Sequence, residues 1–227
     1  MKIGGLEECT LIDFPLKIAC VIYTIGCNFR CPYCHNPELV DETAREIPID
    51  KIWKFLNARK GLLDGVVISG GEPTLHNDLM EMISKIKEMG YLVKLDTNGT
   101  RPAVVKKLIE NNLLDYIAMD IKSPIEMYSI TVGRSVHSDA IRQSIEIIMS
   151  SPVEYEFRTT VVKSLLSPDD IEQIGKEIKG AKKYYLQKFN TGRVLSPQFK
   201  RKTTYTDEEF SSFKKTLLKY VKYCGIR

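Results

Sequence analysis

The sequence has no apolar run near the roughly 18 residues that a membrane-spanning helix needs, so no membrane association is predicted. Its first residues, MKIGGLEECT, show neither the apolar core nor the small-residue cleavage site of a signal peptide. Low-complexity segments and linker-like stretches rich in proline and glycine are also missing. These absences predict a cytoplasmic protein whose 227 residues fold as one domain.

The chain carries only a small excess of positive charge. The chain has 33 Lys and Arg against 29 Asp and Glu, a net charge of +4. This excess is too small to predict binding to nucleic acid, although it would not hinder docking to an acidic electron carrier. Basic residues cluster only at Lys200–Lys202 and Lys214–Lys215. The segment from Gly192 to Lys202 could touch a partner protein, but a mobile surface loop is the expectation.

The cysteines are unevenly placed. In a reducing cytoplasm they are expected to be ligands or core residues rather than disulfides. Three of the 6 are scattered along the chain, and the other three crowd together at Cys27, Cys31 and Cys34. This crowding is the first sign of a functional site.

The crowded cysteines predict a site for a soft metal, since thiolate selects zinc, copper(I) or iron–sulfur clusters. A structural zinc site has four ligands. His35 directly follows Cys34 and is poorly placed to be the fourth, while Cys9 and Cys20 remain possible. A [4Fe–4S] cluster on three cysteines would leave one iron open, unlike a four-thiolate cluster. The spacing favours the cluster and leaves zinc open.

Short β-branched runs alternate with amphipathic stretches along the chain. Strands are predicted at residues 18–25, 64–69, 92–96, 114–121, 153–162 and 184–189. Helices are predicted at 49–59, 77–89, 102–111, 138–149, after Ser167, and at 206–223. Because each helix returns the chain to the same edge, the strands should be parallel. The pattern allows an open partial (β/α)6 barrel or a flat doubly wound sheet.

Polar motifs follow successive strands at their carboxyl ends, where ligands gather in parallel α/β proteins. Taken alone, Gly70–Glu72 and Asp96–Asn98 could be tight turns, and Asp120 with Lys122 a modest ion pair. Arg158, inside the fifth strand, would be costly in a barrel interior unless it met an anion. Their order after a three-cysteine loop is the stronger signal and predicts one composite site.

Together these motifs resemble the radical S-adenosylmethionine (SAM) superfamily. CNFRCPYC is similar to its CxxxCxxC signature, and GGEP to its methionine-binding motif. More narrowly, GCNFRCPYCHNPELV, LDTNG and MDIK resemble the glycyl-radical-enzyme activases, while Gly4–Leu6 and Thr10–Pro15 resemble the activating proteins of anaerobic ribonucleoside-triphosphate reductase. The similarity runs from residue 4 to about 190. It implies a radical SAM type of open partial barrel, with its core at about 16–190 and a C-terminal helix at about 206–223.

The resemblance also implies a role for each motif residue. Cys27, Cys31 and Cys34 would hold one [4Fe–4S] cluster, whose fourth iron would take the amino and carboxylate groups of SAM. The further SAM contacts would be Tyr33 and His35 on the adenine side with Cys34 between them, Gly70, Gly71 and Glu72 at the methionine ammonium, Asp96 and Asn98 after the third strand, Asp120, Ile121 and Lys122 in the Asp-hydrophobe-Lys motif, and Arg158 at the cofactor carboxylate.

The implied reaction starts with one electron from a reduced flavodoxin or ferredoxin. SAM would then be cleaved to methionine and a 5′-deoxyadenosyl radical, which would take hydrogen from a glycine of anaerobic ribonucleoside-triphosphate reductase. The alternatives are activation of another glycyl-radical enzyme such as pyruvate formate-lyase, another radical SAM reaction on a small molecule, and a non-catalytic, zinc-stabilised binding module. No acid–base residue is expected.

Two features separate the chain from related activases. Pyruvate formate-lyase activases carry a His near the end of the sixth strand, where this chain has Gln187-Lys188-Phe189-Asn190. Phe189 could pack on adenine there but could not donate a hydrogen bond. The chain also lacks the cysteine-rich insertion of activases with extra clusters, so one cluster is predicted.

Overall fold

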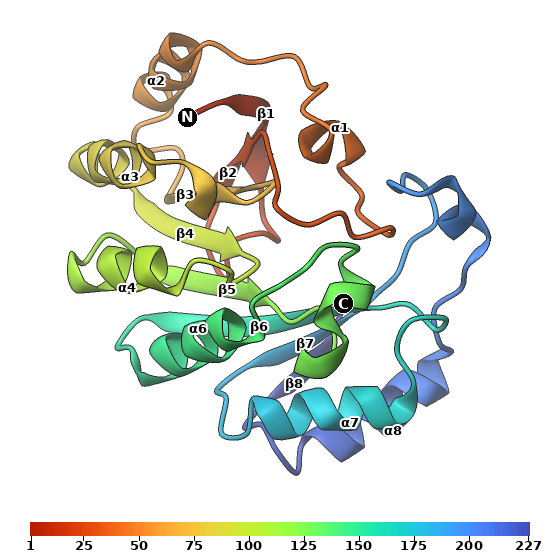
Figure 1. Cartoon of the computed structure of the whole chain (residues 1–227). Coiled ribbons are helices and arrows are strands. Elements are labelled where there is room, and N and C mark those ends of the chain that lie inside the picture. Colours follow the sequence, from red (N-terminus) through yellow and green to blue (C-terminus); the bar gives the residue numbers. More distant parts are fainter.

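One sheet organises the molecule. In the computed structural model, which describes residues 1–227, the sheet has 8 strands in the order β1-β2-β3-β4-β5-β6-β7-β8 (Figure 1). The strands are β1 (Ile3–Thr10), β2 (Ala19–Thr24), β3 (Gly65–Gly70), β4 (Leu92–Thr97), β5 (Tyr116–Asp120), β6 (Glu154–Val161), β7 (Tyr184–Lys188) and β8 (Cys224–Ile226). Strands β2 to β7 are the six that the sequence predicts.

Helices connect the parallel strands. They are α1 (Pro37–Val40), α2 (Ile49–Ala58), α3 (Leu79–Glu88), α4 (Pro102–Glu110), α5 (Tyr128–Thr131), α6 (Ser138–Ser150), α7 (Pro168–Glu177) and α8 (Asp207–Leu217), with short 3-10 turns η1 (Pro73–Leu75), η2 (Ile125–Met127) and η3 (Pro197–Arg201). Local chemistry sets several starts. Ser167 begins α7 and Thr206 begins α8 with capping boxes, and Pro102 occupies the first turn of α4.

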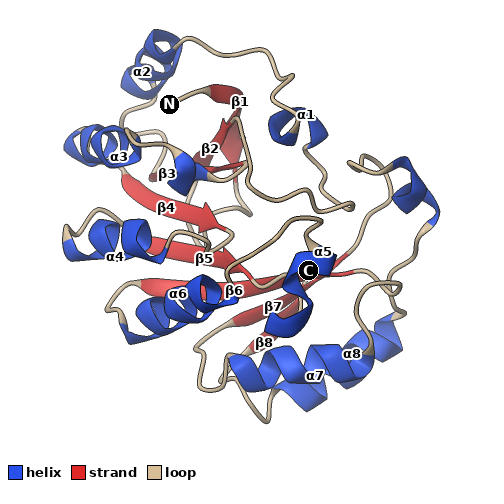
Figure 2. Cartoon of the chain, viewed as in Figure 1, coloured by secondary structure: helices blue, strands red, loops and turns tan.

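The strand order explains the curvature. Pairs from β2 to β8 are all parallel and follow chain order without a reversal. A doubly wound sheet reverses its order at a switch point. Here crossovers of one hand place the helices on one face. Figure 2 shows α2, α3, α4, α6, α7 and α8 along the outer side of the strands. The strands β1 and β8 do not pair, so the expected open partial barrel is confirmed.

Two strands of the sheet were not predicted from the sequence. Strand β1 pairs antiparallel with β2, and the short β8 pairs parallel with β7. The first contains paired glycines and two glutamates, and the second has only three residues, so neither gives a clear strand pattern. The helix expected to reach residue 223 ends at Leu217, and the chain turns back to form β8.

Both faces of the sheet are buried, with different contents. Outward-facing side chains such as Ile22, Ile68 and Leu95 join the main core beneath the helices. On the inner face, Val21, Val67 and Tyr116 pack with Phe14 and Ala19 in a smaller cluster. Farther along the strands the inner face becomes polar. No helix combines the length and the apolar character needed to cross a bilayer.

Candidate active site

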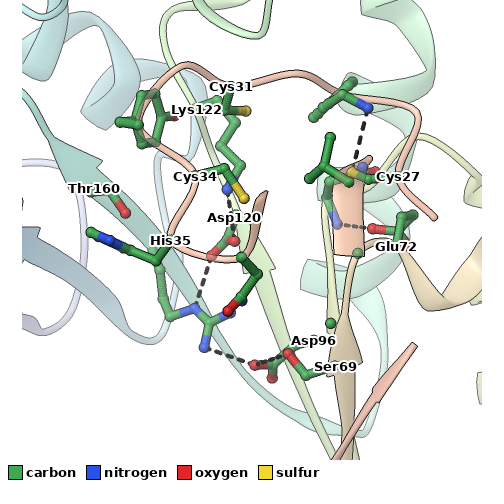
Figure 3. A pocket seen from close by; sticks show the side chains of 18 of the residues that line it. Cys27, Cys31, Cys34, His35, Ser69, Glu72, Asp96, Asp120, Lys122 and Thr160 are labelled. Atoms are coloured by element: carbon green, nitrogen blue, oxygen red, sulfur yellow. Dashed lines mark hydrogen bonds and ion pairs between the residues drawn. The ribbon is translucent and has the colours of Figure 1, made fainter. Parts of the chain in front are cut away.

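A cavity of about 440 Å³ lies at the carboxyl ends of the strands (Figure 3). It gathers nearly all of the residues that the sequence analysis singled out. Those lining it are Cys27, Cys31, Tyr33, Cys34, His35, Gly70, Gly71, Glu72, Asp96, Asn98, Asp120, Lys122 and Arg158. Ile121 is the exception: its side chain is fully buried in the core, and its carbonyl accepts a hydrogen bond from the Thr159 hydroxyl.

The cysteine loop follows β2 and forms one wall of the cavity. Backbone bonds fix it: the Arg30 amide donates to the Val132 carbonyl at 2.8 Å, and the Cys34 amide donates to the Cys31 carbonyl at 2.9 Å. Cys31 is buried, whereas Cys27 and Cys34 are half-buried. Burial raises the pKa of Cys27 to about 12 and that of Cys31 to about 11. Their thiolates therefore need positive charge nearby.

The three sulfurs do not converge on one point. No group of three or more His, Cys, Asp or Glu side chains is placed to hold a single metal ion. Figure 3 shows Cys31 and Cys34 on one side of the cavity wall and Cys27 on the other. This spread differs from a closed tetrahedral zinc site. It fits a cluster with several irons, in which each cysteine binds a different iron.

Lys122 is the cation whose charge acts on all three cysteines of this wall. Its ammonium donates to Asp120 at 2.8 Å, and its charge acts to lower the pKa of each of the three cysteines, against their burial. Burial acts to lower the pKa of Lys122 itself, but Asp120, Tyr33 and Cys31 together outweigh it and the pKa lies well above the ordinary value. The predicted ion pair exists, and it is buried in the site rather than exposed.

The paired glycines after β3 allow a close backbone approach. A Cβ on Gly70, whose φ is +118°, would lie 2.2 Å from the Thr24 amide nitrogen. A Cβ on Gly71 would lie 2.0 Å from the Gly26 carbonyl oxygen. In the same place the Glu72 amide donates to Gly26 at 2.8 Å. Glycine is required here so that the tip of β3 can pack directly against the start of the cysteine loop.

Glu72 joins the tips of two strands. Its carboxylate is buried and accepts hydrogen bonds from the amide and hydroxyl of Thr74, from the Thr97 hydroxyl at 2.8 Å and from the Asn98 amide at 2.6 Å. Burial raises the pKa of Glu72, and these bonds oppose the increase. The carboxylate thus already has four donors from its own chain, which the sequence did not reveal.

Arg158 links the tips of β4 and β5. Its Nη1 lies 3.1 Å from Asp96 Oδ2, and its Nε lies 2.9 Å from Asp120 Oδ1. Burial acts to raise the pKa of Asp96, but Arg158 and Lys94 outweigh it and the pKa is lowered. The pKa of Asp120 is also lowered, because Arg158 and Lys122 overcome its burial. The expected anion for Arg158 is therefore supplied by two carboxylates of the chain.

Lys94 was not among the site residues predicted from the sequence. It is almost completely buried in β4 and pairs with Asp96, two residues farther along the same inner face. A lysine inside an otherwise apolar strand, with a carboxylate at the next position of that face, was the available signal. Three cations, Lys94, Lys122 and Arg158, are thus paired with the two carboxylates of Asp96 and Asp120.

The side expected to receive adenine contains Tyr33 and His35. The Tyr33 hydroxyl is buried and has no hydrogen-bond partner. His35 Nδ1 lies 2.7 Å from the Arg193 carbonyl oxygen. Phe189 is buried and stacks on His35 with ring centroids 6.0 Å apart, so it does not line the cavity. Gln187 lines the cavity instead. Elsewhere in the cavity, Ser69, Thr97, Thr160 and Lys188 are further lining residues that the sequence analysis did not select.

The β7–α8 connection (residues 189–206) packs against the outside of the cysteine loop. The Leu195 amide donates to the Cys34 carbonyl at 2.9 Å, and the Ser196 amide donates to the Pro32 carbonyl at 2.9 Å. These bonds contradict the expectation of a mobile surface loop over residues 192–202. The connection is part of the frame that holds the cysteines.

Comparison with known proteins agrees with this geometry. A family model described as the Radical SAM superfamily matches residues 21–174. A Methanocaldococcus jannaschii protein, provisionally named a glycyl-radical enzyme activating enzyme, is 34% identical over 99% of this chain and 95% of its own length. A pyruvate formate-lyase-activating enzyme of Staphylococcus aureus is 36% identical over 42% of this chain and 40% of its own length.

Solved structures share the fold. SuiB of Streptococcus suis, in a crystal structure with bound S-adenosylmethionine, aligns with a TM-score of 0.71 and 16% identity over 91% of this chain and 49% of that chain. A radical SAM methyltransferase from Sphaerobacter thermophilus aligns with a TM-score of 0.74 and 13% identity over 96% of this chain and 68% of that one. At these identities the likeness concerns the fold alone.

Proposed function

We propose that this chain, which belongs to the radical SAM superfamily and is homologous to glycyl-radical-enzyme activating enzymes, activates anaerobic ribonucleoside-triphosphate reductase. One observation carries the proposal. Three cysteines form one wall of a cavity whose other walls are the polar tips of successive parallel strands. Such a cavity can hold a cluster and an organic cofactor side by side.

The superfamily uses a [4Fe–4S] cluster and SAM, and the residues present fit both. Cys27, Cys31 and Cys34 would hold the cluster, leaving one iron for SAM. When bound, the two cofactors supply a reductive cleavage that yields methionine and a 5′-deoxyadenosyl radical, which removes a hydrogen atom from glycine. The protein's own task is to bind, orient and exclude water.

The charged network provides the orientation. Lys122 and Arg158 line the cavity and would attract the carboxylate of SAM, while Asp96 and Asp120 hold both cations in place. Tyr33 lines the cavity and would contact the cofactor there, while its hydroxyl is buried beside the cysteine loop. Glu72 would act mainly by fixing the strand tips, since its four donors already come from the chain.

The choice of target rests on the segment that resembles the reductase activators. Residues 3–10 form β1, and Asp13 in the following loop lines the cavity. The same segment therefore lines the cavity in which the glycine of a partner would react. Pyruvate formate-lyase is the second candidate, because relatives named as its activating enzymes match part of the chain. We also propose that the chain is a single domain and that reduced flavodoxin or ferredoxin donates the electron.

Electron paramagnetic resonance tests the proposal. The anaerobically reconstituted protein is reduced, mixed with SAM and incubated separately with the reductase and with pyruvate formate-lyase. We expect a glycyl-radical doublet on the reductase only. Cys31→Ala should abolish it, along with the four irons per chain, while Cys9→Ala, outside the cavity, should change neither. A doublet on pyruvate formate-lyase alone would reject the reductase as the target. Stoichiometric zinc in place of iron would favour the zinc-stabilised binding module.

A further inference from the structure

The net positive charge of the chain equals the charge of one short segment. The β7–α8 connection carries Arg193, Lys200, Arg201 and Lys202 and has no Asp or Glu. Of the 33 basic residues, the other 29 are matched by the 29 acidic residues, all of which lie elsewhere. The net charge of +4 is therefore the charge of this connection, on a chain that is otherwise neutral.

These four side chains are exposed on the surface. Arg193 forms a salt bridge with Glu38 at 2.8 Å. Lys200, Arg201 and Lys202, at the end of η3, have no salt-bridge partner within the chain. Three adjacent cations without counter-charges repel one another. They form a basic surface, and an acidic partner bound to it would reduce this repulsion.

The basic surface is attached directly to the frame of the cysteine site. Leu195 and Ser196 hydrogen-bond to the backbone of the cysteine loop. The buried Val194 anchors the connection in the core. Phe199, next to Lys200, packs edge-on against Phe189 at 6.5 Å, and Phe189 in turn stacks on His35 beside Cys34. A short, packed path therefore leads from the basic surface to the cysteines.

We propose that the basic surface at Lys200–Lys202 is the docking site for an acidic one-electron carrier protein, an inference that rests on the proposed function. The reduced carrier gives up one electron, and the cluster held by the three cysteines accepts it, with no other co-reactant. Opposite charges would steer the encounter and raise its rate, and salt would weaken the effect. The carrier would thus approach from outside the cysteine loop, leaving the mouth of the cavity free for the glycyl-radical partner.

A charge-reversal variant tests the docking site. The variant Lys200→Glu/Arg201→Glu/Lys202→Glu is compared with Lys54→Glu/Lys60→Glu/Lys107→Glu, which makes the same change in net charge. The control lysines are exposed and unpaired, and they lie on or beside α2 and α4, across the molecule from the β7–α8 connection (Figure 1). Both reconstituted variants receive electrons from reduced flavodoxin in stopped flow, with loss of cluster absorbance as the readout. Affinity for oxidised flavodoxin is measured in parallel.

We expect the docking variant to be reduced by flavodoxin at least about tenfold more slowly at low salt, with weaker salt dependence and weaker flavodoxin binding. Dithionite, a small reductant, should reduce both variants at the wild-type rate. A wild-type rate with flavodoxin, or an equal loss in the control, overturns the proposal. So does normal reduction by flavodoxin with a lower glycyl-radical yield, which would assign the surface to the radical-accepting partner. Charge-dependent reduction without any glycyl radical would leave the docking site standing and reject the proposed function.

Discussion

Replacing Glu72 by Gln separates a structural role from a direct contact with the cofactor. The Glu72→Gln side chain keeps one oxygen, which can still accept from Thr74 and Thr97. Its new amide group must then face the Asn98 amide, which now donates to a carboxylate oxygen at 2.6 Å. Two hydrogen-bond donors, the new side-chain amide and the Asn98 amide, would then face each other in the protein interior without an acceptor.

The magnitude follows from these contacts. Leaving a buried donor without an acceptor costs about 1–3 kcal/mol. Part of this is offset because the neutral amide avoids the burial of a charge, the effect that raises the pKa of Glu72. We expect a net loss of about 2 kcal/mol, or about 4–8 °C in melting temperature for a chain of this size. Thermal denaturation of the reconstituted protein, followed by circular dichroism, measures it.

The matched control is Glu146→Gln, at an exposed position on α6, which should change stability by less than about 0.5 kcal/mol. Binding of S-adenosylhomocysteine is measured on the same samples. A structural Glu72 predicts that the loss of affinity accompanies the loss of stability. An unchanged melting temperature together with a collapse of affinity would refute this reasoning and show that Glu72 contacts the ligand directly.

Three other perturbations test the site. Arg158→Met should weaken S-adenosylhomocysteine binding at least tenfold in equilibrium dialysis, since both facing carboxylates lose a shared cation; unchanged affinity would contradict the charge argument. The lowered pKa values of Asp96 and Asp120 stabilise the fold above the ordinary Asp pKa of about 3.9 and cease to do so as pH falls through the lowered values. The difference in calorimetric stability between the wild type and Arg158→Met should therefore stay constant from about pH 8 to 5 and become smaller below about pH 4. A difference that grows below about pH 4 would contradict the lowered pKa values of the two aspartates. Lys94→Met should weaken ligand binding as well, with Lys94→Arg restoring part of it; no effect of either change would exclude a role for Lys94 in positioning Asp96.

The sequence allowed good predictions wherever a pattern is local. Alternating β-branched and amphipathic stretches identified β2 to β7, and the rule that ligands gather at strand ends placed the motifs in one cavity. Spacing also identified the three cysteines that share a wall. These features depend on residues close together in the chain.

The features that were missed depend on contacts between distant residues. Strand β8 has three residues and exists because β7 offers an edge to pair with. The hydrogen bonds of Leu195 and Ser196 join residues more than 150 positions from the cysteine loop. The four donors around Glu72 come from two different strand tips, and no pattern around GGEP indicates that its carboxylate is already occupied. Ile121 matched a motif by position, although its side chain faces the core.

The central claim is that this chain uses its cysteine-walled cavity to move a hydrogen atom from a partner's glycine to the adenosyl group of SAM. The most direct test uses a reductase whose glycines carry deuterium at the α-carbon. After anaerobic incubation with the reduced protein and SAM, mass spectrometry measures the 5′-deoxyadenosine released. We predict 5′-deoxyadenosine with one deuterium atom, in amounts equal to the glycyl radical counted by electron paramagnetic resonance. Unlabelled 5′-deoxyadenosine alongside a full radical signal would contradict the claim.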